Sequence, residues 1–315
     1  MLYSPQPMHI PDGFLSLPVS LALWLISILL IGSAVRRLEK TLSEREVPLM
    51  GVLAAAIFAG QMLNFTVTGG TSGHLLGAAL ATILLGPYPA MLVMTSVVSV
   101  QALLFQDGGL VVMGANLFNM AIVGVWSAYA VFSLVRRLAG KARWGLFAGG
   151  FAAAWSSIFL AALACALELA LSGTSPANLA VPAMGGIHAL IGIGEGLITI
   201  GALGFLYAAR PDLLSSENRQ QALNRTVWLG GGILAVLLTV FSPLASSHPD
   251  GLEWVAEQLQ FIESARPPFY EIIPDYLVPG IPNEALATIA AGILGLVVVT
   301  LAAMSAGLLR RRTEG

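Results

Sequence analysis

A short stretch near the start of the chain, Met8-His9-Ile10-Pro11-Asp12-Gly13, combines residue types that can bind a metal ion. If the chain began at Met8, its free amine, the backbone amide of His9 and the His9 imidazole would offer three nitrogen atoms to one ion. The amine and amide nitrogens close a five-membered chelate ring, and the amide and imidazole nitrogens close a six-membered one. This fills three corners of a square and leaves the fourth open, a geometry typical of Ni(II) or Cu(II) rather than of zinc or magnesium.

Seven residues, 1–7, precede Met8 and would remove the free amine. They lack the basic region, the apolar region and the small-residue cleavage site of a signal peptide. We therefore expect translation to start at Met8, or the extension to be trimmed or to be an artefact of the assigned start. The alternative is an ordinary extracellular tail in front of the first helix.

The fourth nitrogen is expected from His74, which ends the glycine-rich stretch Gly69-Gly70-Thr71-Ser72-Gly73. Irregular backbone near a membrane is tolerated only where protein or water satisfies it, so a hairpin dipping into the protein from outside would fit. A single histidine in such a loop is more often structural. The open coordination corner on the same side favours a ligand role for His74.

Further polar residues stand in apolar surroundings. Gln101 and Asn116 are candidates to orient the ligand imidazoles through hydrogen bonds. Nearby Asp107 and Asn119 are expected to cap helix ends.

His188 and Glu195 lie seven residues apart on one face of a glycine-rich helix. The pair could carry a proton, contact a ligand histidine, or form a structural hydrogen bond between spans. Glu168 receives no role. His248-Pro249-Asp250-Gly251 echoes the first stretch, and we attribute the echo to turn chemistry.

The composition predicts an all-α, polytopic membrane protein. The chain is 57% hydrophobic and 10% charged, whereas a soluble domain is about a quarter charged. The single cysteine, Cys165, excludes a disulfide framework and a cysteine-type metal site. The sequence has no G-x-x-x-x-G-K-[ST] phosphate loop, so no ATP site is expected in this chain. No hydrolase motif supports an intramembrane enzyme.

Nine apolar segments are predicted to span the membrane, seven followed by two. They are Leu17–Val35, Pro48–Phe65, Leu75–Leu85, Pro89–Phe105, Ala115–Val135, Leu146–Leu171, Gly186–Ala209, Val227–Val240 and Leu286–Leu309. Of the fifteen Lys and Arg residues, only Arg266 lies outside four clusters between or after these segments. The positive-inside rule then places the N-terminus outside, the C-terminus in the cytoplasm and the acidic loop 244–285 outside, in a plasma (inner) membrane protein.

Four motifs together resemble the CbiM/NikM family, the substrate-capture subunits of energy-coupling-factor transporters for cobalt and nickel. They begin at Met8, Gly69, Phe105 and His188, and the resemblance covers about residues 8–210. It implies that Ni(II) or Co(II) is the transported substrate, held by Met8, His9 and His74. The seven residues before Met8 depart from the family pattern.

Residues 227–309 resemble the two-span accessory subunit of the same transporters, CbiN/NikN, with the motif Pro249-Asp-Gly-Leu-Glu253 in the loop 244–285. The chain is thus expected to be a fusion of a seven-helix capture bundle, residues 8–210, with a two-span portion. The resemblance implies a transmembrane coupling subunit and cytoplasmic ATPase subunits as partners, with membrane lipid around the protein and no nucleic acid.

Three other functions remain open at the level of sequence. A self-sufficient proton-coupled metal carrier would use His188 and Glu195, and its uptake would survive removal of the ATPase partners. An intramembrane enzyme would need an open coordination position, which a four-nitrogen site lacks. A metal sensor would signal through the loop 244–285.

Overall fold

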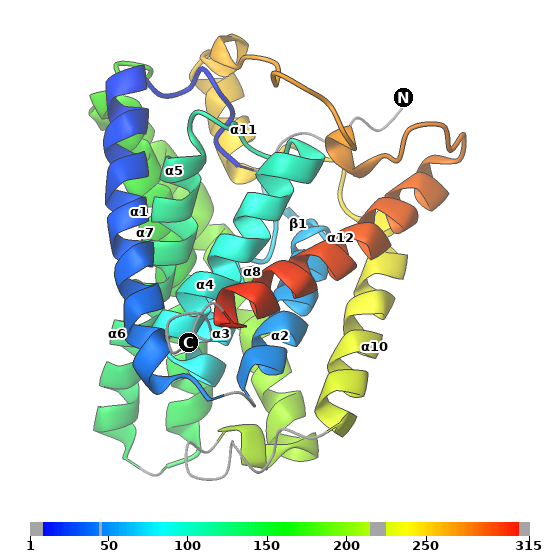
Figure 1. Ribbon diagram of the computed structural model, residues 1–315. Coiled ribbons are helices and arrows are strands. Elements are labelled where there is room, and N and C mark those ends of the chain that lie inside the picture. Colours follow the sequence, from blue (N-terminus) through cyan, green and yellow to red (C-terminus); the bar gives the residue numbers. More distant parts are fainter. Residues whose placement is uncertain (1–8, 44–45, 141, 215–224, 309–315) are drawn as a thin grey trace.

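The chain forms a bundle of helices, and the computed structural model describes residues 9–43, 46–140, 142–214 and 225–308 (Figure 1). The apolar segments are helical because a chain in lipid must satisfy its backbone hydrogen bonds within each segment. The α-helices and strands are α1 (Leu17–Thr41), α2 (Glu46–Gln61), β1 (Phe65–Val67), β2 (Thr71–Gly73), α3 (Ala78–Leu85), α4 (Pro87–Val100), α5 (Met113–Leu117), α6 (Gly124–Ala139), α7 (Trp144–Leu171), α8 (Ala177–Ala209), α10 (Arg225–Phe241), α11 (Gly251–Gln258) and α12 (Glu284–Leu308).

Two helices are extended by π-helical turns. Residues Gln101–Phe105 continue α4, and Phe118–Val123 join α5 to α6. Seven helices in the described part of the chain are therefore long and apolar enough to cross a membrane. On α1, Leu21, Leu25 and Ile28 are each more than half exposed, as a lipid-facing side requires.

All nine predicted segments contain a helix, but two of the helices are shorter than a membrane span. The 16 residues of α2 rise about 24 Å and the 8 residues of α3 about 12 Å, against a hydrocarbon core of about 30 Å. The predicted span Leu75–Leu85 is thus wrong as a helical crossing. Its first residues are irregular, and α3 begins only at Ala78.

The expected glycine-rich hairpin is present as a two-stranded antiparallel sheet. Phe65 pairs with Gly73 and Val67 with Thr71, and Gly69 and Gly70 turn the chain with φ of +93° and +80°. The hairpin delivers residues 74–77 to the interior of the bundle before α3 starts.

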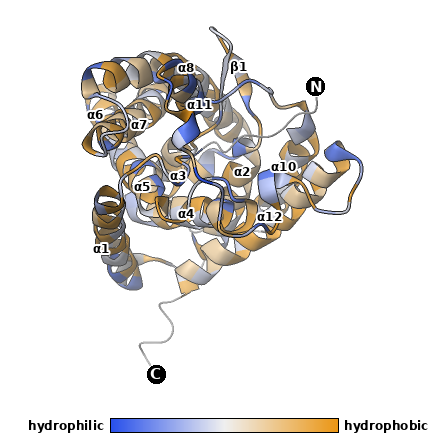
Figure 2. Ribbon diagram, turned by 90° about the horizontal axis from the view of Figure 1, so that it is seen from above, coloured by the Kyte–Doolittle hydropathy of each residue, from blue (hydrophilic) through white to orange (hydrophobic). Residues whose placement is uncertain are grey.

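The two C-terminal helices pack on the N-terminal bundle. In Figure 1, α12 runs obliquely across α2 and α4, and α10 lies beside α2. Small residues make this approach possible, because a Cβ added at Gly295 would meet the ring of Phe58 at 2.2 Å. Seen from above, α11 and the loops around it lie over the bundle (Figure 2).

Candidate metal centre

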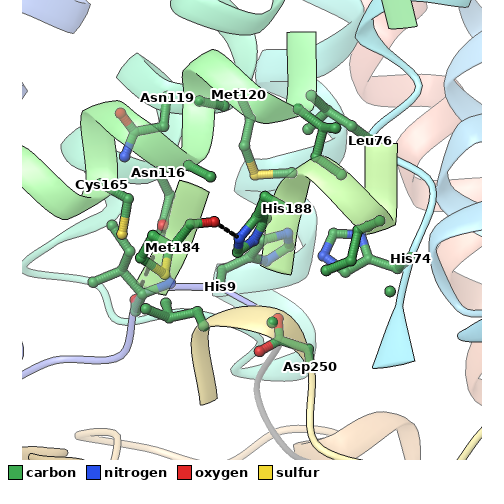
Figure 3. Close-up of a pocket in the computed structure, with 18 residues that line it drawn as sticks. His9, His74, Leu76, Asn116, Asn119, Met120, Cys165, Met184, His188 and Asp250 are labelled. Carbon is green, nitrogen blue, oxygen red and sulfur yellow. Dashed lines mark hydrogen bonds between the residues drawn. The ribbon is translucent and has the colours of Figure 1, made fainter. Parts of the chain in front are cut away.

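A cavity of about 80 Å³ lies where the N-terminal segment, the hairpin, α8 and the start of α11 meet (Figure 3). Three histidines contribute to its lining: His9, His74 and His188. Asn116 and Asp250 line it as well, together with apolar side chains and Cys165. The structure therefore brings together histidines that are 65 and 114 residues apart in the sequence (74 − 9 and 188 − 74).

The imidazole of His9 is buried and paired with Asp107. Its Nδ1 lies 3.2 Å from the backbone oxygen of Asp107 and 3.2 Å from its carboxylate Oδ1. Its Nε2 is buried with no hydrogen-bond partner among the described residues. Burial lowers the pKa of His9, but the Asp107 carboxylate more than offsets this, so the net pKa lies above its ordinary value.

The backbone beside His9 is held at several points. The side-chain amide of Asn116 accepts from the Ile10 N–H and donates to the Ile10 carbonyl, both at 3.1 Å. The Asp12 carboxylate accepts the N–H groups of residues 110, 111 and 112 at 2.9–3.2 Å. The N-terminal segment is thereby fixed against the loop that follows α4.

Two glycines of that loop leave room for the N-terminal segment. A Cβ at Gly108 would meet the Cβ of His9 at 2.9 Å, and one at Gly109 would meet the backbone nitrogen of Asp12 at 2.2 Å. Gly108 also has φ of +98°, a backbone conformation that other residues rarely adopt. The Gly-Gly pair therefore permits a close backbone approach at the site.

The His74 ring contacts the backbone of the next residue and the ring of His9. Its Nδ1 lies 3.1 Å from the Leu75 carbonyl, and its ring meets that of His9 edge-on, with centroids 5.8 Å apart. The buried Glu195 carboxylate accepts the N–H groups of Leu76 and Gly77 at 2.8 and 3.0 Å. Glu195 therefore anchors the segment that follows His74 and the start of α3.

His188 and Glu195 lie on one helix as predicted, but only His188 lines the cavity, whereas Glu195 binds the backbone N–H groups of Leu76 and Gly77. His188 reaches the cavity, and its Nδ1 lies 2.9 Å from the carbonyl of Met184, one turn earlier on α8. Its ring packs under Gly251, where a Cβ would lie 3.0 Å from Nε2.

A chain of hydrogen bonds connects His9 to the C-terminal portion. The Tyr276 hydroxyl donates to the Asp107 carboxylate at 2.6 Å, and Gln101 Nε2 donates to the same hydroxyl at 3.2 Å. The predicted candidates Gln101 and Asn116 therefore act at different points, Gln101 on Tyr276 and Asn116 on the backbone of Ile10.

The structure corrects two minor expectations. The Asp107 carboxylate, expected to cap a helix, instead contacts His9 and Tyr276. Asn119 lies inside a π-helical turn and donates to Glu168 at 2.8 Å, so Glu168 has a partner within the bundle. Sequence analysis missed Tyr276, although its neighbours Asp275 and Pro274 mark a turn in a loop already known to be acidic.

The Pro-Asp-Gly motif of the C-terminal loop is part of the site rather than a separate turn. The Ser72 N–H donates to the Pro249 carbonyl at 2.8 Å, which ties the motif to β2. Asp250 caps α11 by accepting the Glu253 N–H, and it also lines the cavity. Burial raises the pKa of Asp250 to about 7.

The predicted chelate makes a specific demand on His9. A six-membered ring with the His9 amide requires Nδ1, the atom that faces Asp107 in this conformation. Met8, whose amine would complete the chelate, lies outside the described residues. Among the described residues, no group of three His, Cys, Asp or Glu side chains is arranged to hold a metal ion.

Two family descriptions match this chain. The family described as the cobalt uptake substrate-specific transmembrane region, CbiM, matches residues 9–213. The PDGLE domain matches residues 225–312. Together they cover almost all of the described residues.

Named relatives and solved structures agree with these matches. A putative fused nickel transport protein NikMN of Archaeoglobus fulgidus is 39% identical over 295 residues, 93% of this chain and 95% of the relative. A cobalt transport protein CbiM of Sorangium cellulosum is 33% identical over 213 residues, 66% of this chain and 94% of the relative. A crystal structure of a truncated transition metal transporter, 32% identical, covers 64% of this chain and 99% of its own, with a TM-score of 0.57.

Proposed function

Because the chain belongs to the CbiM family of metal transport proteins, fused to a PDGLE domain, we propose that it captures Ni(II) or Co(II) for an ATP-driven energy-coupling-factor importer. Residues 8–210 form the capture unit in this proposal, and residues 227–309 form the accessory unit. The partners are a transmembrane coupling subunit and cytoplasmic ATPase subunits. Nickel is favoured because a planar site with an ionised amide suits it better than Co(II), and the fused relatives are named as nickel transport proteins.

One observation carries the proposal: His9 and His74, from distant parts of the sequence, line the same cavity. The backbone on both sides of this pair is held by buried polar side chains. In the proposed bound state the ion is held by the Met8 amine, the His9 amide and imidazole, and the His74 imidazole. Forming that state requires His9 Nδ1 to leave Asp107.

The proposed orientation in the membrane follows from the distribution of Lys and Arg along the chain. The proposal places the N-terminus and the loop 244–285 outside the cell and the C-terminus in the cytoplasm. The ion then enters from outside, where α11 covers the cavity. Release follows when the ATPase partners reorient the bundle and break the four-nitrogen geometry.

The contacts of Glu195 argue against a self-sufficient proton-coupled carrier. A proton carrier must exchange its proton with water during transport, whereas both Glu195 carboxylate oxygens accept backbone N–H groups inside the bundle. Replacing this carboxylate would disturb the backbone beside His74. Glu195 is better explained as an anchor.

Nickel and cobalt accumulation in cells tests the function. Cells that express the chain with its coupling and ATPase subunits should accumulate the metal, and cells with an inactive ATPase should not. Uptake that survives loss of ATPase activity would replace the proposal with the proton-coupled carrier. No accumulation of either metal with all partners present would overturn the metal-import function itself.

A further inference from the structure

The four histidines of the chain are unevenly distributed. His9, His74 and His188 line the cavity, whereas His248 is exposed in the neighbouring loop. The proposed four-nitrogen set uses only His9 and His74. His188 is thus a third imidazole in the cavity with no part in that set.

The three cavity imidazoles share one arrangement of their ring nitrogens. Nδ1 of His74 and Nδ1 of His188 each lie within 3.1 Å of a backbone carbonyl, and Nδ1 of His9 lies beside Asp107. Carbonyl and carboxylate oxygens only accept, so each Nδ1 carries the hydrogen and the lone pair of the neutral ring is on Nε2. Metal-binding histidines are typically oriented this way, with the second nitrogen donating to an oxygen.

The surroundings of the Nε2 atoms are also consistent with imidazoles oriented to bind a metal ion. Nε2 of His9 is buried with no hydrogen-bond partner among the described residues. Nε2 of His188 lies under Gly251, at the side of the cavity covered by α11. Figure 3 shows the three rings around one space.

We propose that Nε2 of His9, His74 and His188 form a receiving site for a divalent transition metal ion, occupied before the N-terminal chelate forms. This inference rests on the proposed function. Three imidazoles suit Ni(II), Co(II) and Zn(II). The rings of His9 and His74 are 5.8 Å apart at 85°, and His188 lines the same cavity. The described side chains are not arranged to hold an ion in this conformation, so the receiving site requires the rings to rotate toward one another.

The receiving site explains how the metal ion could be held before His9 Nδ1 is free to bind it. The chelate needs Nδ1 of His9, which is engaged with Asp107, whereas Nε2 of this cavity-lining ring has no hydrogen-bond partner among the described residues. An ion held first by Nε2 atoms stays in the cavity while the His9 ring turns and presents Nδ1. His188 then drops out of the coordination set, so it affects the rate of loading more than the final affinity.

The test uses His188→Asn, with His248→Asn as the matched control. Asparagine can place a donor nitrogen near the position of Nδ1, where it can donate to the Met184 carbonyl, and it removes the outer part of the ring together with the Nε2 lone pair. Each variant is purified twice in detergent, as the full chain with residues 1–7 and as a chain that begins at Met8. The probes are CoCl2, followed by the visible absorption of high-spin Co(II), and NiCl2, followed by stopped-flow absorption.

In the chain with residues 1–7, which lacks the Met8 amine, Co(II) should bind through imidazoles, and His188→Asn should weaken binding ~10–100-fold. In the chain that begins at Met8, His188→Asn should slow Ni(II) association by a similar factor and leave the equilibrium affinity within about threefold. The control His248→Asn should match the unaltered protein in both.

Two results would overturn the receiving site: no Co(II) binding to the chain with residues 1–7, or equal behaviour of His188→Asn and His248→Asn in both chains. If His188→Asn does not fold, His188→Gln serves in its place, since its terminal group lies near Nε2 but provides no imidazole lone pair. Failure of the unaltered Met8 chain to bind Ni(II) would instead reject the proposed function.

Discussion

The two histidines of the proposed chelate are supported in parallel but different ways. Beside His9, Asp12 and Asn116 hold the backbone. Beside His74, Glu195 and Gln61 do so. In each case one buried carboxylate and one buried amide satisfy backbone groups of an irregular segment, as buried backbone requires.

The two histidines differ in what their imidazole rings contact. The ring of His74 contacts the carbonyl of the next residue, a local interaction. The ring of His9 contacts a carboxylate that is held in turn by Tyr276, 169 residues further along the chain. The C-terminal portion therefore reaches the His9 imidazole through side chains. It contacts the hairpin before His74 through its own backbone, because the carbonyls of His248 and Pro249 accept hydrogen bonds from Ser72 and Thr71.

The largest effects should come from the ligands. His9→Ala removes the imidazole and leaves at most two N-terminal nitrogens, and His74→Ala reopens the fourth corner. Each should abolish Ni(II) retention, measured as metal per purified protein by atomic emission. His248→Ala is the control and should retain the metal. A variant of either ligand that binds normally would show that the assigned ligand set is wrong.

The backbone anchors should have unequal effects. Asn116→Ala leaves the buried Ile10 N–H without its partner, at a cost of about 1–3 kcal/mol, while the Ile10 carbonyl still accepts the Gly109 N–H. We expect Ni(II) affinity, measured by calorimetry, to fall ~10–100-fold. Gln61→Ala removes one donor from the Leu76 carbonyl, while the Leu76 N–H stays bound to Glu195. Its effect should be smaller, and equal losses would contradict the proposed difference between the two segments.

Asp107→Asn should change the pH dependence of metal binding. Protons compete with the ion for the His9 imidazole, and the Asp107 carboxylate raises the pKa of that imidazole. Removing the charge should shift the pH of half-maximal Ni(II) binding downward in a pH titration. The same shift in His248→Asn, or none in Asp107→Asn, would argue that another group controls the competition.

The stability of the metal-free protein should also depend on the His9–Asp107 pair. A folded-state pKa of His9 above its ordinary 6.5 stabilises the protein fully below that pH. This contribution is lost as the pH rises through the raised pKa. Thermal unfolding of the unaltered protein should therefore show a fall in Tm over that interval, and Asp107→Asn should reduce this fall.

Tyr276→Phe should have the smallest effect. It keeps the stacking of this ring on Phe105, whose centroid is 4.6 Å away, and removes only the hydroxyl that holds Asp107. Ni(II) affinity should fall by less than tenfold, below the ~10–100-fold expected for Asn116→Ala. Gln101→Leu, which removes a donor to that hydroxyl, should produce a fraction of this change.

The sequence was informative wherever the signal is local. Apolar segments predicted the helices, and the glycine-rich stretch before His74 predicted the hairpin, because both depend on neighbouring residues. The length of α3 was missed since an apolar run does not show where an irregular segment ends inside a bundle. The contacts of Asp107 with His9 and Tyr276 were missed for another reason: the partners are 98 and 169 residues away, and no local pattern encodes such contacts.

The most direct test of the account is the coordination of Ni(II) in the loaded, purified protein, by X-ray absorption on a chain whose first residue is established by mass spectrometry. For a chain that begins at Met8, we predict four nitrogen donors in a planar arrangement. Oxygen or sulfur donors, or six-fold coordination, would contradict the claim that the tip of the chain and His74 together hold the ion.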